Sequence, residues 1–149
     1  MFTRALVVVD RPAPRQLLSW ARRLMAPAGG DVRLLVVLPE VRAVVADGRT
    51  VAFTDQQEDG ARRAAEFALD GVVARLREDG LGASAEVRFG KPSAAVLAAA
   101  RAWRAEVVAI LERPARRWRA WLEGDVVGDI LKLSPVPVLV ARASGQRSA

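Results

Sequence analysis

Short, uninterrupted runs of valine, leucine and isoleucine constrain the fold of this chain more than any other feature. Four of them read as strands: Ala5–Val9, Arg33–Leu38, Glu106–Leu111 and Val138–Ala141. Runs of this length without polar alternation are typical of strands buried on both faces of a parallel sheet. Ala83–Phe89 alternates more weakly and predicts a further strand, third in chain order.

Segments with one-faced helical spacing separate these runs. The predicted helices extend from Pro14 to Gly29, from Thr54 or Asp55 to Gly80, from Pro92 past Trp103, and over Asp125–Leu133. In the longest one, an apolar stripe from Ala61 to Leu76 predicts a continuous buried face. Alternating strands and helices predict one doubly wound α/β domain over residues 1–143, with a parallel sheet covered on both faces and a flexible tail at 144–149.

Residues 41–53 interrupt this alternation. Two β-prone runs, Val44–Ala46 and Arg49–Val51, flank Asp47 and Gly48. An Asp-Gly pair favours a tight hairpin turn, so the segment predicts a small hairpin or flap.

Composition excludes several kinds of site. The 149 residues include no His, Cys or Tyr, which excludes disulfides, thiolate metal sites and Cys or His nucleophiles. No apolar run approaches the roughly 18 residues that span a bilayer, so we expect a cytoplasmic protein. The net charge is +6, but the arginines are scattered, which favours a solvated basic surface over a dedicated anion-binding face.

In a doubly wound sheet the ligand crevice lies outside the carboxyl ends of the strands, where the strand order reverses. The loop after Leu111 and the helix that starts at Gly124 and Asp125 are therefore the expected functional region.

Several segments resemble the universal stress protein family: Ala5–Asp10, the Gly90-Lys91-Pro92 turn, Glu106–Leu111 and, most specifically, Gly124–Val140. The resemblance implies an adenine nucleotide alpha hydrolase-like fold with a five-stranded parallel sheet in the order 3-2-1-4-5. It also implies a homodimer formed through the last strand. The interface residues would be Val136, Val138, Leu139 and Val140. An uncharged apolar edge strand independently favours pairing with a second copy.

Many members of that family bind ATP through a pattern of glycine, two residues, glycine, nine residues, glycine and then serine or threonine. Aligned on Gly124, this chain has Leu111 and Pro114 at the first two glycine positions and Asp125 at the hydroxyl position. Leucine adds a side chain, and proline has no N–H to offer a phosphate. Aspartate is itself a preferred N-cap, whose carboxylate accepts the hydrogen bonds that a phosphate would need. The pattern predicts a degenerate site with no cofactor and no metal.

The alternative is an adenine nucleotide in an altered site. The resemblance would place Asp10, Val37, Ile110 and Val126 against the nucleotide, although the three apolar residues fit a core equally well and Asp10 fits a turn. Arg116 and Arg117, in a loop with Arg113 and Arg119, would replace the glycines as phosphate clamps. The ligand would then be ATP or AMP, with or without Mg²⁺.

Two further hypotheses are weaker. Trp118 and Trp121 beside the arginines resemble a surface for single-stranded nucleic acid or an anionic membrane, but packing onto the sheet edge or a dimer partner is preferred. Asp10 and Asp125 could hold a divalent ion in a hydrolase, yet two aspartates are a weak signal. We therefore expect a non-enzymatic, homodimeric stress-response or regulatory domain that acts on an unknown protein partner. Slow ATP hydrolysis is left open.

Overall fold

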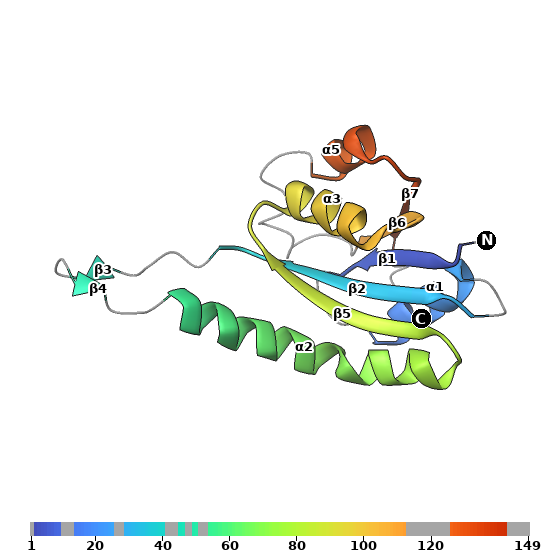
Figure 1. The fold of residues 1–149 in the computed structure, drawn as a ribbon, viewed down its shortest axis with the longest axis horizontal. Helices are drawn as coiled ribbons and strands as arrows, with labels where there is room; N and C mark the ends of the chain where they lie inside the picture. The colour runs from blue at the N-terminus through green and yellow to red at the C-terminus, as the bar shows by residue number, and fades with distance from the viewer. Residues whose placement is uncertain are drawn as a thin grey trace, which may run out of the picture.

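Five parallel strands form one sheet in the order β5-β2-β1-β6-β7 (Figure 1). The computed structural model describes residues 2–9, 14–25, 29–40, 45–46, 49–50, 54–112 and 126–142. The strands are β1 (Arg4–Val8), β2 (Asp31–Leu38), β5 (Gly82–Phe89), β6 (Val107–Glu112) and β7 (Val138–Arg142). Counted along the chain without the hairpin, this order is 3-2-1-4-5, which confirms the predicted topology. The predicted tail at 144–149 lies outside the described residues.

The predicted hairpin is present as two short strands, β3 (Val45–Ala46) and β4 (Arg49–Thr50). They pair antiparallel, with Val45 opposite Thr50 and Ala46 opposite Arg49. The hairpin forms its own two-stranded sheet and does not join the five-stranded one.

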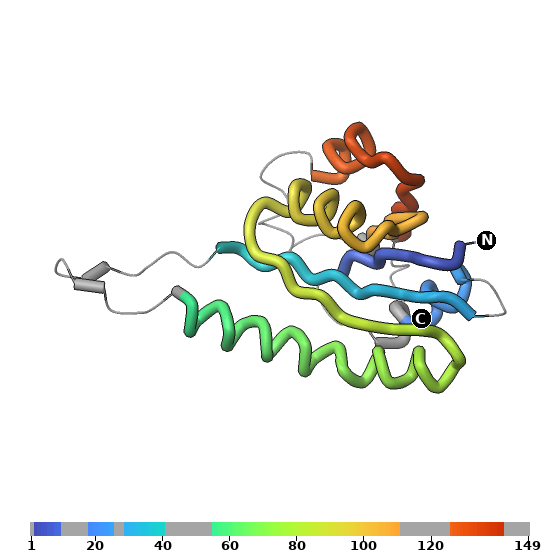
Figure 2. Tube along the Cα trace, in the orientation of Figure 1, coloured from blue at the N-terminus to red at the C-terminus, as the bar shows by residue number. Residues whose placement is uncertain are grey.

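Among the described helices, α1 (Pro14–Leu24) and α2 (Thr54–Glu78) cover one face of the main sheet and α3 (Pro92–Trp103) and α5 (Val126–Leu133) cover the other (Figure 2). α1 and α2 supply Ala21, Leu69 and Leu76 to one apolar cluster. α3 and α5 supply Val96 and Ile130 to a second cluster on the opposite face. The domain is therefore the doubly wound α/β sandwich that the alternating pattern predicts.

The central strand β1 belongs to both clusters. Ala5, Val7 and Val9 point into the first, and Leu6 and Val8 point into the second. Successive side chains of a strand point to opposite faces, so an unbroken apolar run is needed where both faces are covered. The run identified in the sequence meets that need.

The buried stripe predicted for α2 is confirmed in its second half and only in part in its first, where Ala61 and Ala65 are half-buried and Ala65 packs against the first cluster. Ala64 and Ala68 are exposed, and continuous burial begins only at Leu69. The helix has 25 residues, about 37 Å at ~1.5 Å per residue, whereas β5 has eight residues, about 26 Å at ~3.3 Å each. The first turns of α2 therefore extend past the strands that the helix covers, as Figure 1 shows.

Serine and proline place β7 beside β6. The Ser134 hydroxyl donates to the Val136 carbonyl at 2.7 Å and accepts from the Val136 N–H at 3.2 Å. Pro137 lacks an N–H, but its carbonyl accepts from the Val108 N–H at 3.0 Å. Proline is tolerated at the start of a strand, and this bond fixes where β7 begins along β6.

A polar clamp joins the amino ends of β1 and β6, opposite the expected crevice. The Thr3 hydroxyl donates to Glu106 Oε1 at 2.5 Å and the Thr3 N–H donates to Oε2 at 3.1 Å. The bond from the hydroxyl, and to a lesser degree the bond from the N–H, holds the pKa of the exposed Glu106 carboxyl below its ordinary value. Because the folded-state pKa is depressed, the stabilisation is present above the ordinary glutamate pKa and is lost as pH falls through the lowered value.

Truncating the central strand tests this account of the core. Leu6→Ala removes a fully buried side chain and should lower the free energy of unfolding by about 2–5 kcal/mol. Phe67→Ala, at an 81% exposed position of α2, should change it by less than about 0.5 kcal/mol. Denaturant unfolding of both variants measures the difference, and equal effects would contradict the packing described.

Candidate functional site

The strand order reverses between β1 and β6. β1 is followed by α1 on the face of the first cluster, whereas β6 is followed, further along the chain, by α5 on the opposite face. The two strands pair in parallel, with Val8 opposite Ile110 near their carboxyl ends. Connections that leave toward opposite faces open a crevice at this point of the sheet edge.

Three predicted site residues come together beneath that crevice. Val37, Ile110 and Val126 are 9%, 0% and 7% exposed and belong to the second apolar cluster. They come from β2, β6 and the first position of α5. Their burial is what core residues would show, and it leaves little of their surface available to a ligand.

The polar residues predicted for the site lie outside the described residues. They are Asp10, Arg116, Arg117, Gly124 and Asp125. The loop residues Arg113, Arg119, Trp118 and Trp121 lie there too. The backbone of Leu111 is described: β6 continues through Leu111 to Glu112, opposite Ala141 and Arg142 of β7. The position that aligns with the first family glycine is therefore part of the sheet ladder.

The capping role of Asp125 stays a prediction, because this residue lies outside the described residues. The helix begins at Val126, so Asp125 occupies the preceding position, where aspartate side chains accept hydrogen bonds from the first turn. A second carboxylate, Asp129, lies in the first turn of the same helix. A negative side chain in the first turn complements the helix dipole and opposes a bound anion.

The predicted interface residues lie on or next to the edge strand β7. Leu139 and Val140 are 38% and 37% exposed, while Val136 and Val138 are partly buried and pack against the second cluster. In the described part of the chain, β7 pairs only with β6. Leu131 and Leu133 of α5 are also exposed, at 54% and 60%, and the sequence interpretation missed them. The spacing of Leu131 from Val126 and Ile130 puts it off the buried stripe and was an available signal. Leu133 lies three residues after Ile130, on the stripe, so its spacing did not indicate its exposure.

Sequence reasoning also missed a polar pocket on the other side of the carboxyl edge. It lies around the Gly90-Lys91-Pro92 turn, between the ends of β2 and β5, and Arg62 of α2 lines it. The sequence interpretation used this turn as a helix start and as part of the family resemblance, and it did not place a binding site there. Because the charged residues are far apart in sequence, no motif connects them.

The described residues contain no cluster of three or more acidic side chains that could bind a metal ion. Among the helices described, none is long and apolar enough to cross a membrane.

Comparisons with known proteins agree with this fold. The model of the universal stress protein family matches residues 1–142. No curated protein matches the chain significantly.

Solved structures with the same fold are distant in sequence. A universal stress protein family member from Burkholderia pseudomallei superposes with a TM-score of 0.68 at 18% identity, covering 95% of this chain and 97% of that one. One from Arabidopsis thaliana, described with AMP bound, gives 0.60 at 16% identity and covers 99% and 96%. One from Archaeoglobus fulgidus, described in complex with dAMP, gives 0.55 at 18% and covers 93% and 97%. At such identities these likenesses establish the fold alone.

A substitution at Asp125 tests whether this residue caps α5. Asp125→Ala should lower the free energy of unfolding by about 1 kcal/mol, because the first-turn N–H groups lose their acceptor. Asp125→Ser keeps a capping oxygen and should stay close to the parent protein. Thermal or denaturant unfolding of the two variants measures this, and a neutral Asp125→Ala would contradict the capping role.

Proposed function

The chain belongs to the universal stress protein family, and from this premise we propose that it is a homodimeric regulatory domain that acts through protein contacts. In this proposal it neither catalyses a reaction nor binds ATP at the family position. The observation that carries the proposal is the apolar edge of β7 and α5, which no other described residues cover.

The edge combines unpaired backbone groups with exposed apolar side chains, which are the two features of a pairing surface. β7 presents its free side with backbone N–H and C=O groups that no described strand pairs, and unpaired strand edges recruit another chain. Apart from Phe67, every large apolar side chain exposed in the described residues comes from the last two elements. These side chains are Leu131, Leu133, Leu139 and Val140. Apolar groups concentrated in this way mark an interaction surface.

A second copy is the partner that best suits this edge. Two β7 strands related by a twofold axis would pair antiparallel, and the same residues would meet from both sides. Leu139 and Val140 would then lose their contact with water. Val136 and Val138, already packed against the core, would support the interface from within.

The backbone at the family's glycine positions supports the absence of ATP. Leu111 has a Cβ and lies in the ladder with β7, so its N–H is directed along the sheet. Pro114 has no N–H, and Asp125 would place a carboxylate where the hydroxyl residue belongs. Each departure weakens a phosphate cradle.

The composition supports a role without catalysis. With no His, Cys or Tyr in the chain, proton transfer and nucleophilic attack would depend on carboxylates, hydroxyl groups, lysines or arginines. Only two lysines are present, Lys91 and Lys132. The stress-response or regulatory role itself follows from the family.

The second candidate is an adenine-nucleotide-binding protein with an altered phosphate site. It is favoured by relatives of the same fold that are described with AMP, dAMP or cAMP. Asp10 would meet the base or ribose, above the apolar cluster that holds Val37, Ile110 and Val126. Arg116 and Arg117 would bind the phosphates in place of the glycines. Gly124 and Asp125 would face the phosphates from the start of α5.

Thermal stability in the presence of nucleotide separates the two candidates. We expect no shift in the melting temperature with millimolar ATP, ADP or AMP, with or without Mg²⁺. A clear shift that disappears in Arg116→Ala/Arg117→Ala and survives in Arg63→Ala/Arg75→Ala, at exposed positions of α2, would favour the second candidate instead.

The dimer has its own test. Leu139→Asp places a charge in the proposed interface and should convert a dimer to a monomer, with little effect on the fold because Leu139 is already partly exposed. Light scattering coupled to size-exclusion chromatography measures the mass. Phe67→Asp, an equally drastic change at an exposed position of α2, is the control and should remain dimeric. A monomeric parent protein, or a dimeric Leu139→Asp, would contradict the proposed interface.

A further inference from the structure

A second pocket, separate from the crevice between β1 and β6, lies where β2 and β5 end. Its volume is about 440 Å³, within the range of ~300–1,000 Å³ typical of small-molecule sites. Its charged lining comes from four parts of the chain: Glu40 after β2, Arg62 on α2, Arg88 on β5 and Lys91 before α3. We propose that this pocket binds a small organic phosphate, with the phosphate group on the basic residues and a hydroxyl or amino group on Glu40.

Glu40 does not neutralise the basic residues around the pocket. In the described part of the chain, no ion pair within 4 Å joins Glu40 to Arg62, Arg88 or Lys91. Arg88 is already paired with Glu86, so Arg62 and Lys91 are the two cations left to balance a single carboxylate. A concave surface with this excess of positive charge concentrates anions.

Arg62 is held in position with much of its donor capacity free. Its guanidinium carbon lies 5.5 Å from the centre of the Phe89 ring, and Nη1 donates to the Val87 carbonyl at a long 3.5 Å. Stacking on the ring orients the planar group, whose remaining N–H groups have no acceptor among the described residues. A pre-oriented guanidinium matches the oxygens of a phosphate in a two-pronged geometry.

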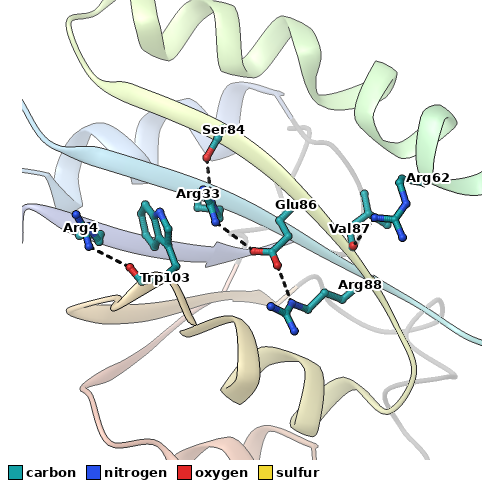
Figure 3. A network of polar contacts seen from close by, with 8 residues as sticks. All are labelled: Arg4, Arg33, Arg62, Ser84, Glu86, Val87, Arg88 and Trp103. Atoms are coloured by element: carbon teal, nitrogen blue, oxygen red, sulfur yellow. Dashed lines mark hydrogen bonds and ion pairs between the residues drawn. The ribbon is translucent and has the colours of Figure 1, made fainter. Parts of the chain in front are cut away.

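Arg88, the remaining cation of the lining, is held by a polar network (Figure 3). Its Nε donates to Glu86 Oε1 at 2.7 Å, while Glu86 Oε2 lies 3.6 Å from Arg33 Nη1. Arg33 is itself fixed by a 3.1 Å bond from its Nε to the Ser84 hydroxyl. Glu86 Oε2 has no hydrogen-bond partner of its own, so the carboxylate depends on the bond from Arg88. Binding of a phosphate therefore rests on Arg62 and Lys91.

The turn into α3 supplies the second unpaired cation and brings Glu40 close. Gly90 has φ +121°, a conformation that side-chain-bearing residues rarely adopt, and its N–H donates to the Leu38 carbonyl at 3.0 Å. A Cβ at Gly90 would lie 3.5 Å from Glu40 Oε1, so the backbone passes close to that carboxylate. Lys91 is the N-cap residue of α3 and is exposed, and its ammonium group has no ion pair among the described residues.

The mixture of charges defines the ligand class. The basic residues suit a phosphate dianion. Glu40 only accepts hydrogen bonds when it is ionised, so it would repel an ion that has no hydrogen-bond donor. A phosphate monoester that carries a hydroxyl or amino group satisfies both parts of the pocket. Inorganic phosphate and sulfate satisfy only the basic part.

Titration of the full-length, ¹⁵N-labelled protein tests the assignment. Glycerol 3-phosphate should cause saturable shifts at the backbone amides of Gly90, Lys91 and Ala94, and should bind at least about threefold more tightly than inorganic phosphate or sulfate. Arg62→Ala should weaken the binding of glycerol 3-phosphate by about tenfold or more. Arg62→Lys should weaken it less, because a positive charge remains. Arg63→Ala, the matched control at the adjacent exposed position of α2, should bind like the parent protein.

Glu40→Ala separates an organic phosphate from a free anion. It should abolish the preference for glycerol 3-phosphate while inorganic phosphate binds as well as before or better. Equal affinities for all three anions in the parent protein would mean an adventitious ion only and would overturn the assignment. Shifts centred on Val9 and Val126, or equal losses in Arg62→Ala and Arg63→Ala, would overturn it too. The spectrum of each variant also reports whether it has folded, and none of these results depends on the dimer.

Discussion

The structure depends on the parallel pairing of β1 between β2 and β6, with both faces of the strand packed against helices. Leu6, Val7 and Val8 are fully buried, and each has strand neighbours on both sides. A shift of one residue in this pairing would exchange the side chains between the two apolar clusters. Because the register is fixed in this way, the carboxyl ends of β2 and β6 bring Val37 and Ile110 to the same place, next to the start of α5.

The two edges of the sheet differ in chemistry, and this difference gives the molecule two distinct surfaces. β7 and α5 expose leucine and valine at one edge. At the other edge, β5 carries Ser84, Glu86 and Arg88 on the face opposite α2. Arg33 joins this row and also lies 5.0 Å from the Trp103 ring centre, so the polar row is tied to the end of α3 (Figure 3). An apolar edge favours association with another chain, whereas a polar, charged edge resists it and favours small ligands.

Much of the fold was predictable because its strands are buried on both faces and leave a strong signal. The hairpin was predictable from Asp47 and Gly48, since few other pairs suit its turn. The strand order came from the family resemblance and not from periodicity. By contrast, the partial exposure of the first half of α2 could not be predicted, because an apolar stripe does not reveal that its helix is longer than the strands beneath it.

The candidate sites were predictable only in part, for a different reason. Val37, Ile110 and Val126 do cluster, but their burial is what a core would also require. The pocket that contains Arg62 and Lys91 was missed because three-dimensional packing, rather than any local pattern, brings those residues together. Leu131 and Leu133 are informative only when the partners of α5 are known. Sequence periodicity predicts which side of a helix faces the core. It does not predict whether the exposed side chains contact solvent or another chain.

Hydrogen exchange of the β1 amides tests the central claim most directly. If β1 is the strand on which both clusters depend, the N–H groups of Leu6, Val7 and Val8 should exchange only through global unfolding, with the same free energy as denaturant unfolding gives. Amides of the edge strands β5 and β7 should exchange faster. Exchange of the β1 amides at edge-strand rates would contradict the claim that this strand organises the domain.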